Sequence, residues 1–127
     1  MDFIKNQEQY WEFIRQLRND DRVKSGFIQQ DYITKESHAK YMKKYGDNYY
    51  VCLIDKEPAG YVGVIDKDIR VATHPNFQGR GVGKFMIDAL MKLYPDSLAK
   101  VKIDNEVSIR LFEKCGFKKK FYLLEKT

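Results

Sequence analysis

The sequence predicts one domain of mixed α and β structure, built on a single central, mostly antiparallel sheet of six to seven strands flanked by helices. Three observations lead to this expectation. The length of 127 residues suits one ordinary domain, so residues 1–127 are expected to fold as a single unit. Apolar residues make up 43% of the chain, which is enough to bury a core. Runs of β-forming residues are followed by a helix–strand–helix–strand order.

The amino-terminal part is expected to hold one short strand and two helices. Residues 1–5 form the strand. Between Gln7 and Leu17 the apolar residues fall three and four positions apart, which is the spacing of an amphipathic helix. A second helix should begin at Thr34, because its hydroxyl can cap the free amides, and should end at residues 46–48.

A meander of three strands is expected next. Residues 49–54 and 59–65 are runs of β-formers, and the four residues between them predict a hairpin connection. A turn at residues 66–67 then leads into a third strand at residues 68–73. These strands would form the antiparallel centre of the sheet.

The remainder of the chain alternates helix and strand. Residues 84–94 are expected to form a helix, because their apolar residues form a stripe along one side of it. The proline at position 95 ends this helix. Residues 97–103 are expected to form a strand. Residues 105–115 should form a helix closed by Gly116, because glycine best tolerates the left-handed turn after a helix. Residues 117–124 would add the last strand.

The charge balance narrows the classes of partner. The formal charge of +5 suits a polyanion, but it does not choose between nucleic acid and a phosphorylated cofactor. No groove-reading helix or stacking motif accompanies it, so no nucleic-acid partner is predicted. Cys52 and Cys115 are too few for a disulfide framework and lack the spacing of a metal site.

The sequence also predicts a cellular location. No apolar run approaches the ~20 residues of a membrane-spanning helix. The chain does not open with a basic region followed by an apolar stretch, so no secretory signal is predicted. We therefore expect a cytoplasmic protein without a membrane partner.

The segment most informative about function runs from Val71 to Lys84. A predicted strand ends here, a turn with three glycines follows, and a long helix begins at once. The first amides of a helix have no internal partner and lie at the positive end of its dipole. Glycines let this backbone approach a phosphate closely, and Arg80 and Lys84 add positive charge. The segment is therefore predicted to bind an anion.

The glycine spacing excludes two common nucleotide motifs. Gly79, Gly81 and Gly83 are spaced by two throughout, so the Gly-x-Gly-x-x-Gly pattern of dinucleotide folds is missing. Lys84 is followed by Phe85, so the Gly-Lys-Ser/Thr pattern of a P-loop is missing as well.

Two linked motifs resemble those of the GNAT acetyltransferase superfamily. Gln78-Gly79-Arg80-Gly81-Val82-Gly83 matches the pattern Gln/Arg-x-x-Gly-x-Gly/Ala, and Thr73-His74-Pro75 is similar to the strand end before it. Residues 105–117 are similar to the second motif, which is an asparagine, then an aromatic, then Gly-Phe. The resemblance covers residues 48–124 well and the amino-terminal part by element order only. It implies a sheet whose fourth and fifth strands splay apart around the pantetheine arm of acetyl-CoA.

The resemblance also implies which residues hold acetyl-CoA. Backbone groups at Val71 and Thr73 would bond the pantetheine like a strand, and the amides from Gly79 to Lys84 would hold the pyrophosphate. Asn105 would contact the arm from the other side, although it is also a favoured helix N-cap, and the two roles can coexist. The implied cofactor-binding residues are Val71, Ala72, Thr73, Gln78, Gly79, Arg80, Gly81, Val82, Gly83, Lys84, Asn105 and Phe112.

In this family the acyl group passes directly to an amine, so the enzyme aligns the amine with the thioester and stabilises the oxyanion. A backbone amide near Thr73 is the expected oxyanion donor. The candidate catalytic bases are His74 and His38, because histidine titrates near neutrality, with Asp66 and Asp68 as further candidates.

Phe112 is a departure from the family pattern. It occupies the position at which a tyrosine usually protonates the departing thiolate, and phenylalanine has no proton to give. No general acid is therefore assigned. Phe112 either packs against the pantetheine or is a core aromatic of an amphipathic helix.

The acceptor is expected to be a small-molecule amine, with an amino sugar preferred. Residues 17–20 and 33–38 loosely resemble a pattern found in GNAT enzymes that acetylate amino sugars on nucleotide carriers, although helix capping explains the same residue types. Two alternatives stay open: a protein or peptide N-acetyltransferase, and a non-catalytic coenzyme A-binding module, which Phe112 favours. Exposed strand edges would also allow a homodimer.

Overall fold

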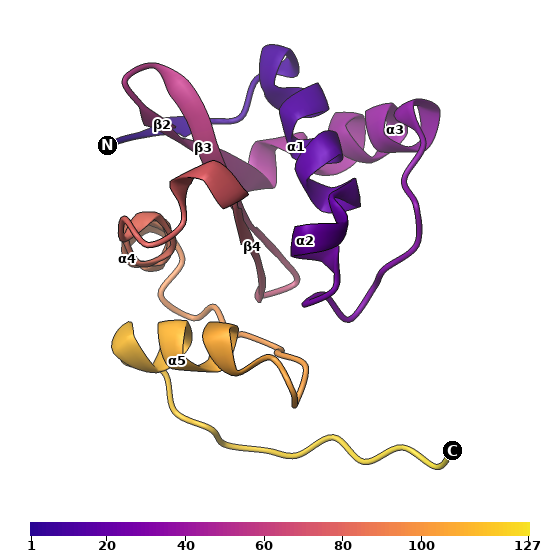
Figure 1. The fold of residues 1–127 in the computed structure, drawn as a ribbon, viewed down its shortest axis with the longest axis vertical. Coiled ribbons are helices and arrows are strands. Elements are labelled where there is room, and N and C mark those ends of the chain that lie inside the picture. The colour runs from indigo at the N-terminus through magenta and orange to yellow at the C-terminus, as the bar shows by residue number, and fades with distance from the viewer.

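The computed structural model describes residues 1–127 and contains one antiparallel sheet in the order β1-β2-β3-β4, with helices on both faces (Figure 1). The strands are β1 (Asp2–Lys5), β2 (Tyr49–Ile54), β3 (Glu57–Ile65) and β4 (Asp68–Thr73). The α-helices are α1 (Trp11–Asn19), α2 (Asp21–Lys24), α3 (Lys35–Tyr45), α4 (Val82–Leu93) and α5 (Glu106–Lys114). The 3-10 helices are η1 (Glu8–Tyr10), η2 (Gly46–Asn48) and η3 (Pro75–Phe77).

Two tight turns join the strands of the meander. Asp55 and Lys56 have φ values of 49° and 67°, and Asp66 and Lys67 have 50° and 67°. Two-residue turns with positive φ at both positions match the twist of antiparallel strands. The first connection is therefore shorter than the four residues predicted, because residues 57–58 already pair with β2.

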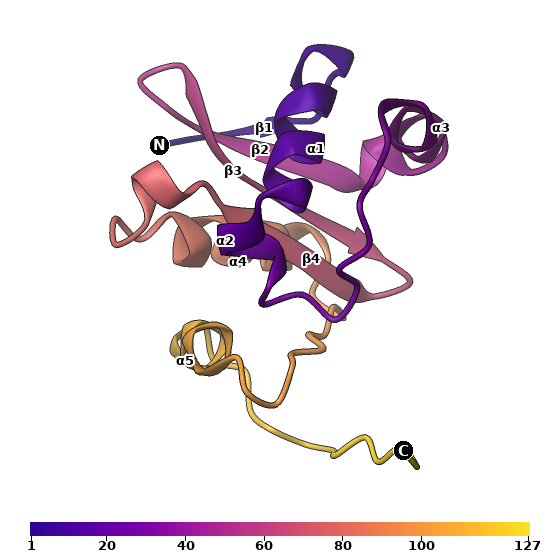
Figure 2. The same ribbon diagram turned by 45° about the vertical axis from the view of Figure 1, so that its right-hand side comes forward.

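The sheet separates two apolar clusters, because alternate residues of a strand point to opposite faces. Tyr50 and Cys52 face a cluster that includes Met86 of α4 and reaches α5. Tyr49 faces the other cluster, which includes Ile14 of α1 and reaches α3. Figure 2 shows α1 and α3 on one side of the sheet and α4 on the other. The sheet is thus buried on both faces.

The helix boundaries agree with the expected capping chemistry. The Thr34 hydroxyl accepts a hydrogen bond from the Ser37 amide at 3.1 Å, so Thr34 caps α3 as predicted. Gly116 follows α5 with a φ of 94°, which confirms its role in closing that helix. α4 begins at Val82, two residues before the predicted start.

The predicted count of six to seven strands is corrected to four. Residues 97–103 make only one parallel bridge, in which the Ile69 amide donates to the Leu98 carbonyl and the Leu98 amide donates to the Lys67 carbonyl. The segment then diverges from β4, so the expected fifth strand does not form. Residues 117–124 consequently have no strand beside them, and this tail runs clear of the sheet (Figure 1).

No helix of the chain has both the length and the apolar character needed to cross a lipid bilayer. The longest helix, α4, has 12 residues.

His38 belongs to the packed face beneath α1 and α3. Its side chain is 2% exposed, and its Nε2–H donates to the Trp11 carbonyl at 3.0 Å. Nδ1 is then the acceptor that faces Arg18 Nη1 at 3.5 Å. Burial lowers the pKa of His38 to about 4, and the charge of Arg18 acts in the same direction.

We expect the free energy of unfolding to fall as the pH is lowered from about 6.5 to about 4. The unfolded chain binds a proton on His38 in this range, whereas the folded chain excludes it, so acid favours unfolding. The loss should be about 2 kcal/mol after allowance for solvent screening. Urea unfolding at pH 7 and pH 4.5 measures it, with His38→Gln as the comparison because an amide can still donate to the Trp11 carbonyl. An equal pH dependence in both proteins would contradict the assignment.

Candidate functional site

The predicted anion-binding loop lies where β4 leads through η3 into α4. Gly79 and Gly81 have φ values of 80° and 77°, which side-chain-bearing residues rarely adopt, and no atom lies within 4 Å of where a Cβ would stand. These two glycines turn the loop and leave open space before it. Gly83 differs, because a Cβ there would lie 2.8 Å from Leu111 Cδ2 of α5. Gly83 therefore permits close packing of α4 on α5.

The backbone N–H groups from Gly79 to Lys84 have no hydrogen-bond acceptor within the chain. Gly81 is the N-cap of α4 and provides no side-chain cap, so the first turn of this helix is open. The positive end of the helix dipole lies at the same point. This arrangement can bind a phosphate or pyrophosphate group through main-chain donors.

Two cationic side chains belong to this loop and differ in their partners. The Arg80 guanidinium carbon lies 5.4 Å from the centroid of the Phe77 ring and has no carboxylate partner. Lys84 Nζ is 2.6 Å from Asp88 Oδ2, and this hydrogen bond raises the pKa of Lys84. Arg80 is therefore the side chain whose positive charge is left free for an anion.

The outer edge of β4 adjoins the loop and is open. The Ile69 amide points outward to Leu98, whereas the His74 amide donates to the Ala59 carbonyl of β3. Because backbone groups of alternate residues point the same way in a ladder, those of Val71 and Thr73 point away from β3. Both residues thus offer unpaired N–H and C=O groups beside the loop.

Ala72 differs from its two neighbours. It is the partner of Tyr61 in the β3–β4 ladder, so its backbone groups are used by the sheet. Its side chain lies in the cluster that faces α1 and α3. Of the three β4 residues expected to contact a cofactor, Val71 and Thr73 therefore have free main-chain groups and Ala72 does not.

His74 lies at the end of β4, half-buried beside the loop. Its Nδ1 accepts a hydrogen bond from the Asn76 amide at 3.0 Å, so a neutral ring has its proton on Nε2. The Phe13 ring of α1 stacks against it at a centroid distance of 6.4 Å.

The other candidate bases are not at the loop. His38 contacts Trp11, Arg18 and Tyr41 but no residue of the β4–α4 connection. Asp66 and Asp68 lie at the opposite end of β4 from Thr73. Asp68 Oδ2 also accepts a hydrogen bond from Arg70 Nε at 3.2 Å. The structure therefore brings only His74 to the loop.

The polar atoms of Asn105 are bonded within the chain. Its Oδ1 accepts from the Ser108 amide at 3.2 Å, which confirms the N-cap of α5, and its Nδ2 donates to the Gly26 carbonyl at 3.1 Å. Lys102 Nζ likewise donates to the Ser25 carbonyl at 3.3 Å. These bonds tie the connection after α2 to the start of α5, which the sequence did not indicate.

Phe112 is a core residue of α5. Its side chain is 6% exposed and its ring meets that of Phe117 edge to face at 5.2 Å. It belongs to the cluster between the sheet and α4. This position fits the packing role that the sequence left open for it.

A polar group of residues under α1 and α3 was missed by sequence reasoning. The Tyr41 and Tyr49 hydroxyl oxygens are 2.6 Å apart, and the Tyr49 and Tyr61 rings lie 5.9 Å apart. The Arg18 guanidinium lies 5.0 Å from the centroid of the Tyr41 ring. The available signal was that Tyr49 and Tyr61 lie on neighbouring strands and point to the same face of the sheet. The amphipathic helices cover that face, so the tyrosines had to pack against them.

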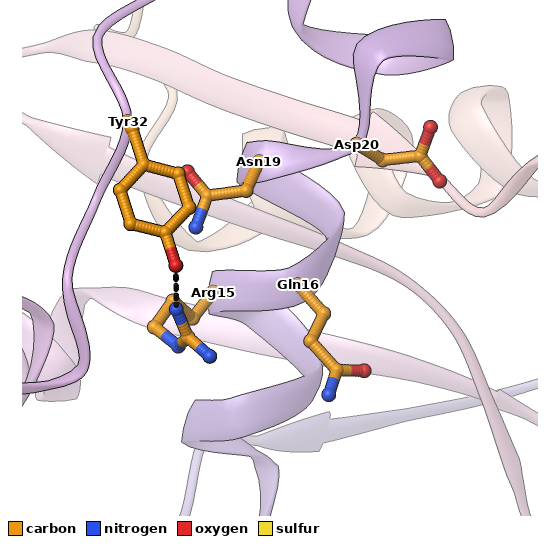
Figure 3. Close-up of a pocket in the computed structure, with 5 residues that line it drawn as sticks. All are labelled: Arg15, Gln16, Asn19, Asp20 and Tyr32. Atoms are coloured by element: carbon orange, nitrogen blue, oxygen red, sulfur yellow. Dashed lines mark hydrogen bonds between the residues drawn. The ribbon is translucent and has the colours of Figure 1, made fainter.

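A shallow hollow of about 270 Å³ lies on the outer side of α1 (Figure 3). Arg15 Nη1 donates there to the Tyr32 hydroxyl at 3.2 Å, and Arg15 also pairs with Glu12 at 2.6 Å. The Asn19 side chain exchanges two hydrogen bonds of 2.8 Å with the Ile33 backbone. These groups are already bonded, so they fix the connection between α2 and α3. No group of three or more metal-ligating side chains occurs in the chain.

Known structures share this fold. One is a spermidine N-acetyltransferase from Vibrio cholerae in complex with CoA and spermine, with a TM-score of 0.83 and 18% identity over 98% of this chain and 85% of that one. Another is AAC(6′)-Iy with the bisubstrate analogue CoA-S-monomethyl-acetylneamine, with a TM-score of 0.74 and 15% identity over 99% of this chain and 96% of that one. An N-acetyltransferase from Staphylococcus aureus has a TM-score of 0.79 and 15% identity over 92% of this chain and 82% of that one.

By sequence, the chain matches none of the proteins of curated function. The model of the Acetyltransferase (GNAT) family matches residues 11–117. This range contains α1, β4, the open loop, α4 and α5, and therefore every element that builds the site described above. The chain belongs to the acetyltransferase (GNAT) family.

Proposed function

We propose that this protein is an N-acetyltransferase that moves an acetyl group from acetyl-CoA directly to the primary amine of a small acceptor, with an amino sugar preferred. The observation that supports this most strongly is the run of unbonded amides from Gly79 to Lys84 beside the open edge of β4. No other part of the chain combines main-chain donors for a pyrophosphate with a free strand edge for an extended arm.

The residues present fit acetyl-CoA. The amides of the α4 amino terminus would hold its pyrophosphate, with Arg80 adding a free positive charge. The backbone groups of Val71 and Thr73 would bond the pantetheine arm along the edge of β4. Two of the three structural neighbours named above are complexes that contain CoA or a CoA-linked analogue, which supports the same choice.

Acetyl-CoA, when bound, supplies an activated thioester carbonyl. The outward-pointing Thr73 amide is the proposed donor to the acetyl oxygen, which would gain negative charge as the amine nitrogen adds to the acetyl carbon and lose it as the carbon–sulfur bond breaks. An amine attacks only in its neutral form. With a reference pKa of ~7.7–8.0 for an α-amino group, a useful neutral fraction exists near neutral pH without a strong base.

His74 is proposed to position the acceptor through its Nε2–H. Its Nδ1 lone pair is already used by the Asn76 amide, so the ring can take up a proton only if that bond breaks. Water is then the proposed proton acceptor. His38 is proposed to be structural, because both of its ring nitrogens are bonded in the core. Phe112 has no hydroxyl, so the thiolate would also be protonated by water.

The proposed class of acceptor, a small amine, is supported by the structural neighbours. Two of the three neighbours named above are a spermidine N-acetyltransferase with spermine and an enzyme with an acetylneamine analogue, which supports a small amine. A non-catalytic coenzyme A-binding module is the second candidate, and Phe112 in place of a proton donor is the observation in its favour. Turnover of any amine would remove that candidate, whereas tight coenzyme binding without turnover would support it.

Millimolar acetyl-CoA should raise the unfolding temperature. A ligand that binds only the folded state at ~100 times its dissociation constant stabilises by ~2.7 kcal/mol, which is readily measured by thermal unfolding. NAD and ATP serve as controls, because the motifs of their usual sites are missing. No rise with acetyl-CoA would mean that the loop is structural, and the proposed activity would fail.

Gly81→Glu should abolish the stabilisation by acetyl-CoA, because it places bulk and negative charge where the pyrophosphate is proposed to lie. Gly116→Glu is a matched control: Gly116 also has a positive φ and open space around it, but it follows α5 outside the loop. The control should keep the response to acetyl-CoA. Retained binding in Gly81→Glu would refute the loop assignment.

His74→Gln should lower kcat/KM by less than about tenfold, whereas loss of a general base typically costs ~10²–10⁴-fold. Steady-state kinetics from pH 6 to 9 measure the effect, and the acetyl-CoA thermal response of the variant shows whether the loop is intact. A larger fall, together with loss of an ionisation from the pH profile, would instead identify His74 as the proton acceptor.

A further inference from the structure

Arg18 is one of two arginines of the chain that have no anionic partner. Four arginines lie within 3.2 Å of a carboxylate oxygen, and these are Arg15, Arg22, Arg70 and Arg110. Arg80 is also unpaired, and it lies in the loop proposed to hold a pyrophosphate. Arg18 is half-buried on α1 and contacts only the His38 ring nitrogen at 3.5 Å and the Tyr41 ring at 5.0 Å.

The groups around Arg18 do not neutralise its charge. Burial keeps His38 uncharged near neutral pH, since its pKa lies at about 4. Burial also raises the pKa of Tyr49, so its hydroxyl remains protonated. A guanidinium partly withdrawn from water and left without an anion is unfavourable, whereas its planar fork is well suited to a phosphate or carboxylate. Arg18 is therefore arranged to accept an anion.

Tyr61 adds a second polar group to the same place. Its side chain is 3% exposed, and its hydroxyl forms no hydrogen bond within the chain. The Tyr61 ring lies 5.9 Å from that of Tyr49, whose hydroxyl is 2.6 Å from the Tyr41 hydroxyl, and Arg18 lies over the Tyr41 ring, so Tyr61 and Arg18 belong to the same cluster. The hydroxyl can donate to an anion held by Arg18.

The position of this pair suits an acceptor rather than the coenzyme. Tyr61 is the ladder partner of Ala72, which adjoins Thr73 at the proposed point of transfer. Both Tyr61 and Ala72 face α1 and α3, whereas the open amides of α4 lie on the other side of the sheet (Figure 2). An acceptor amine that approaches Thr73 from the α1 side would therefore bring its remaining groups toward Arg18.

We propose that Arg18, together with the Tyr61 hydroxyl, recognises a phosphate or carboxylate group carried by the amine acceptor. This inference rests on the proposed acetyl transfer and narrows its substrate class. An amine without an anionic group, such as spermidine, leaves Arg18 unpaired and is a poor acceptor.

The direct test follows the arginine side-chain resonances of ¹⁵N-labelled protein that has been saturated with CoA, so that the α4 loop is filled. Inorganic phosphate and acetate are added separately at constant ionic strength, which distinguishes the two kinds of anion. The Arg18 Nε–H signal, assigned from Arg18→Gln, should shift saturably with at least one of them. Arg110→Gln removes the same charge from an exposed pair on α5 and should leave that shift unchanged. A signal that does not move saturably with either anion overturns the inference.

The kinetic test compares acceptors that differ only in the anionic group, glucosamine and glucosamine 6-phosphate. A charged hydrogen bond should favour the phosphorylated amine in kcat/KM by about tenfold or more. Arg18→Gln should remove that preference, Arg18→Lys should restore part of it, and Arg110→Gln should keep it. An equal preference in the wild type and in Arg18→Gln overturns the inference.

The outcomes separate this inference from the proposed function. Failure to bind acetyl-CoA removes the proposed function itself. The protein could bind the coenzyme and acetylate amines that carry no anionic group, while the Arg18 signal does not respond to either anion. That result removes only the anion site. If Arg18→Gln does not fold or neither sugar is acetylated, the Arg18 resonance in the wild-type protein still decides, with Arg18→Lys providing its assignment.

Discussion

The candidate site depends on one constraint: β4 is fully paired along only one of its two edges, the edge that faces β3. β4 forms a full ladder with β3. On its other edge, the Ile69 amide of β4 donates to the Leu98 carbonyl, and the segment after Leu98 then moves away from β4. The backbone groups of Val71 and Thr73 therefore remain unpaired at the point where the chain turns into α4. A sheet that continued regularly past β4 would satisfy these groups internally and leave nothing for an extended ligand to bond.

Close packing beneath the sheet then fixes the start of α4. A Cβ at Gly60 would lie 2.8 Å from Met86 Cε, and one at Gly83 would lie 2.8 Å from Leu111 Cδ2. These glycines let α4 approach β3 on one side and α5 on the other. The open amides of the first turn are thereby held on a rigid helix beside the β4 edge, so binding an anion there would require little reordering.

Charge is distributed differently on the two sides of the sheet. Four of the six arginines are paired with a carboxylate, which leaves Arg80 at the α4 loop and Arg18 on α1. The first stands beside main-chain donors and the second beside buried tyrosines. The first is the region proposed to bind the coenzyme, and the second is the one proposed to bind an anionic group of the acceptor.

The sequence by itself determined the elements whose signals are local. Helix ends depend on residues only a few positions away. The start of α3 at Thr34 and the two ends of α5 at Asn105 and Gly116 were therefore predictable, as was the glycine loop. Tertiary structure alone decided the strand count, because a run of β-formers at residues 97–103 becomes a strand only if a neighbour offers it a continuous edge. It also decided that His38 is buried, that His74 lies at the loop and that Arg18 is unpaired, because these facts depend on contacts between residues far apart in the chain.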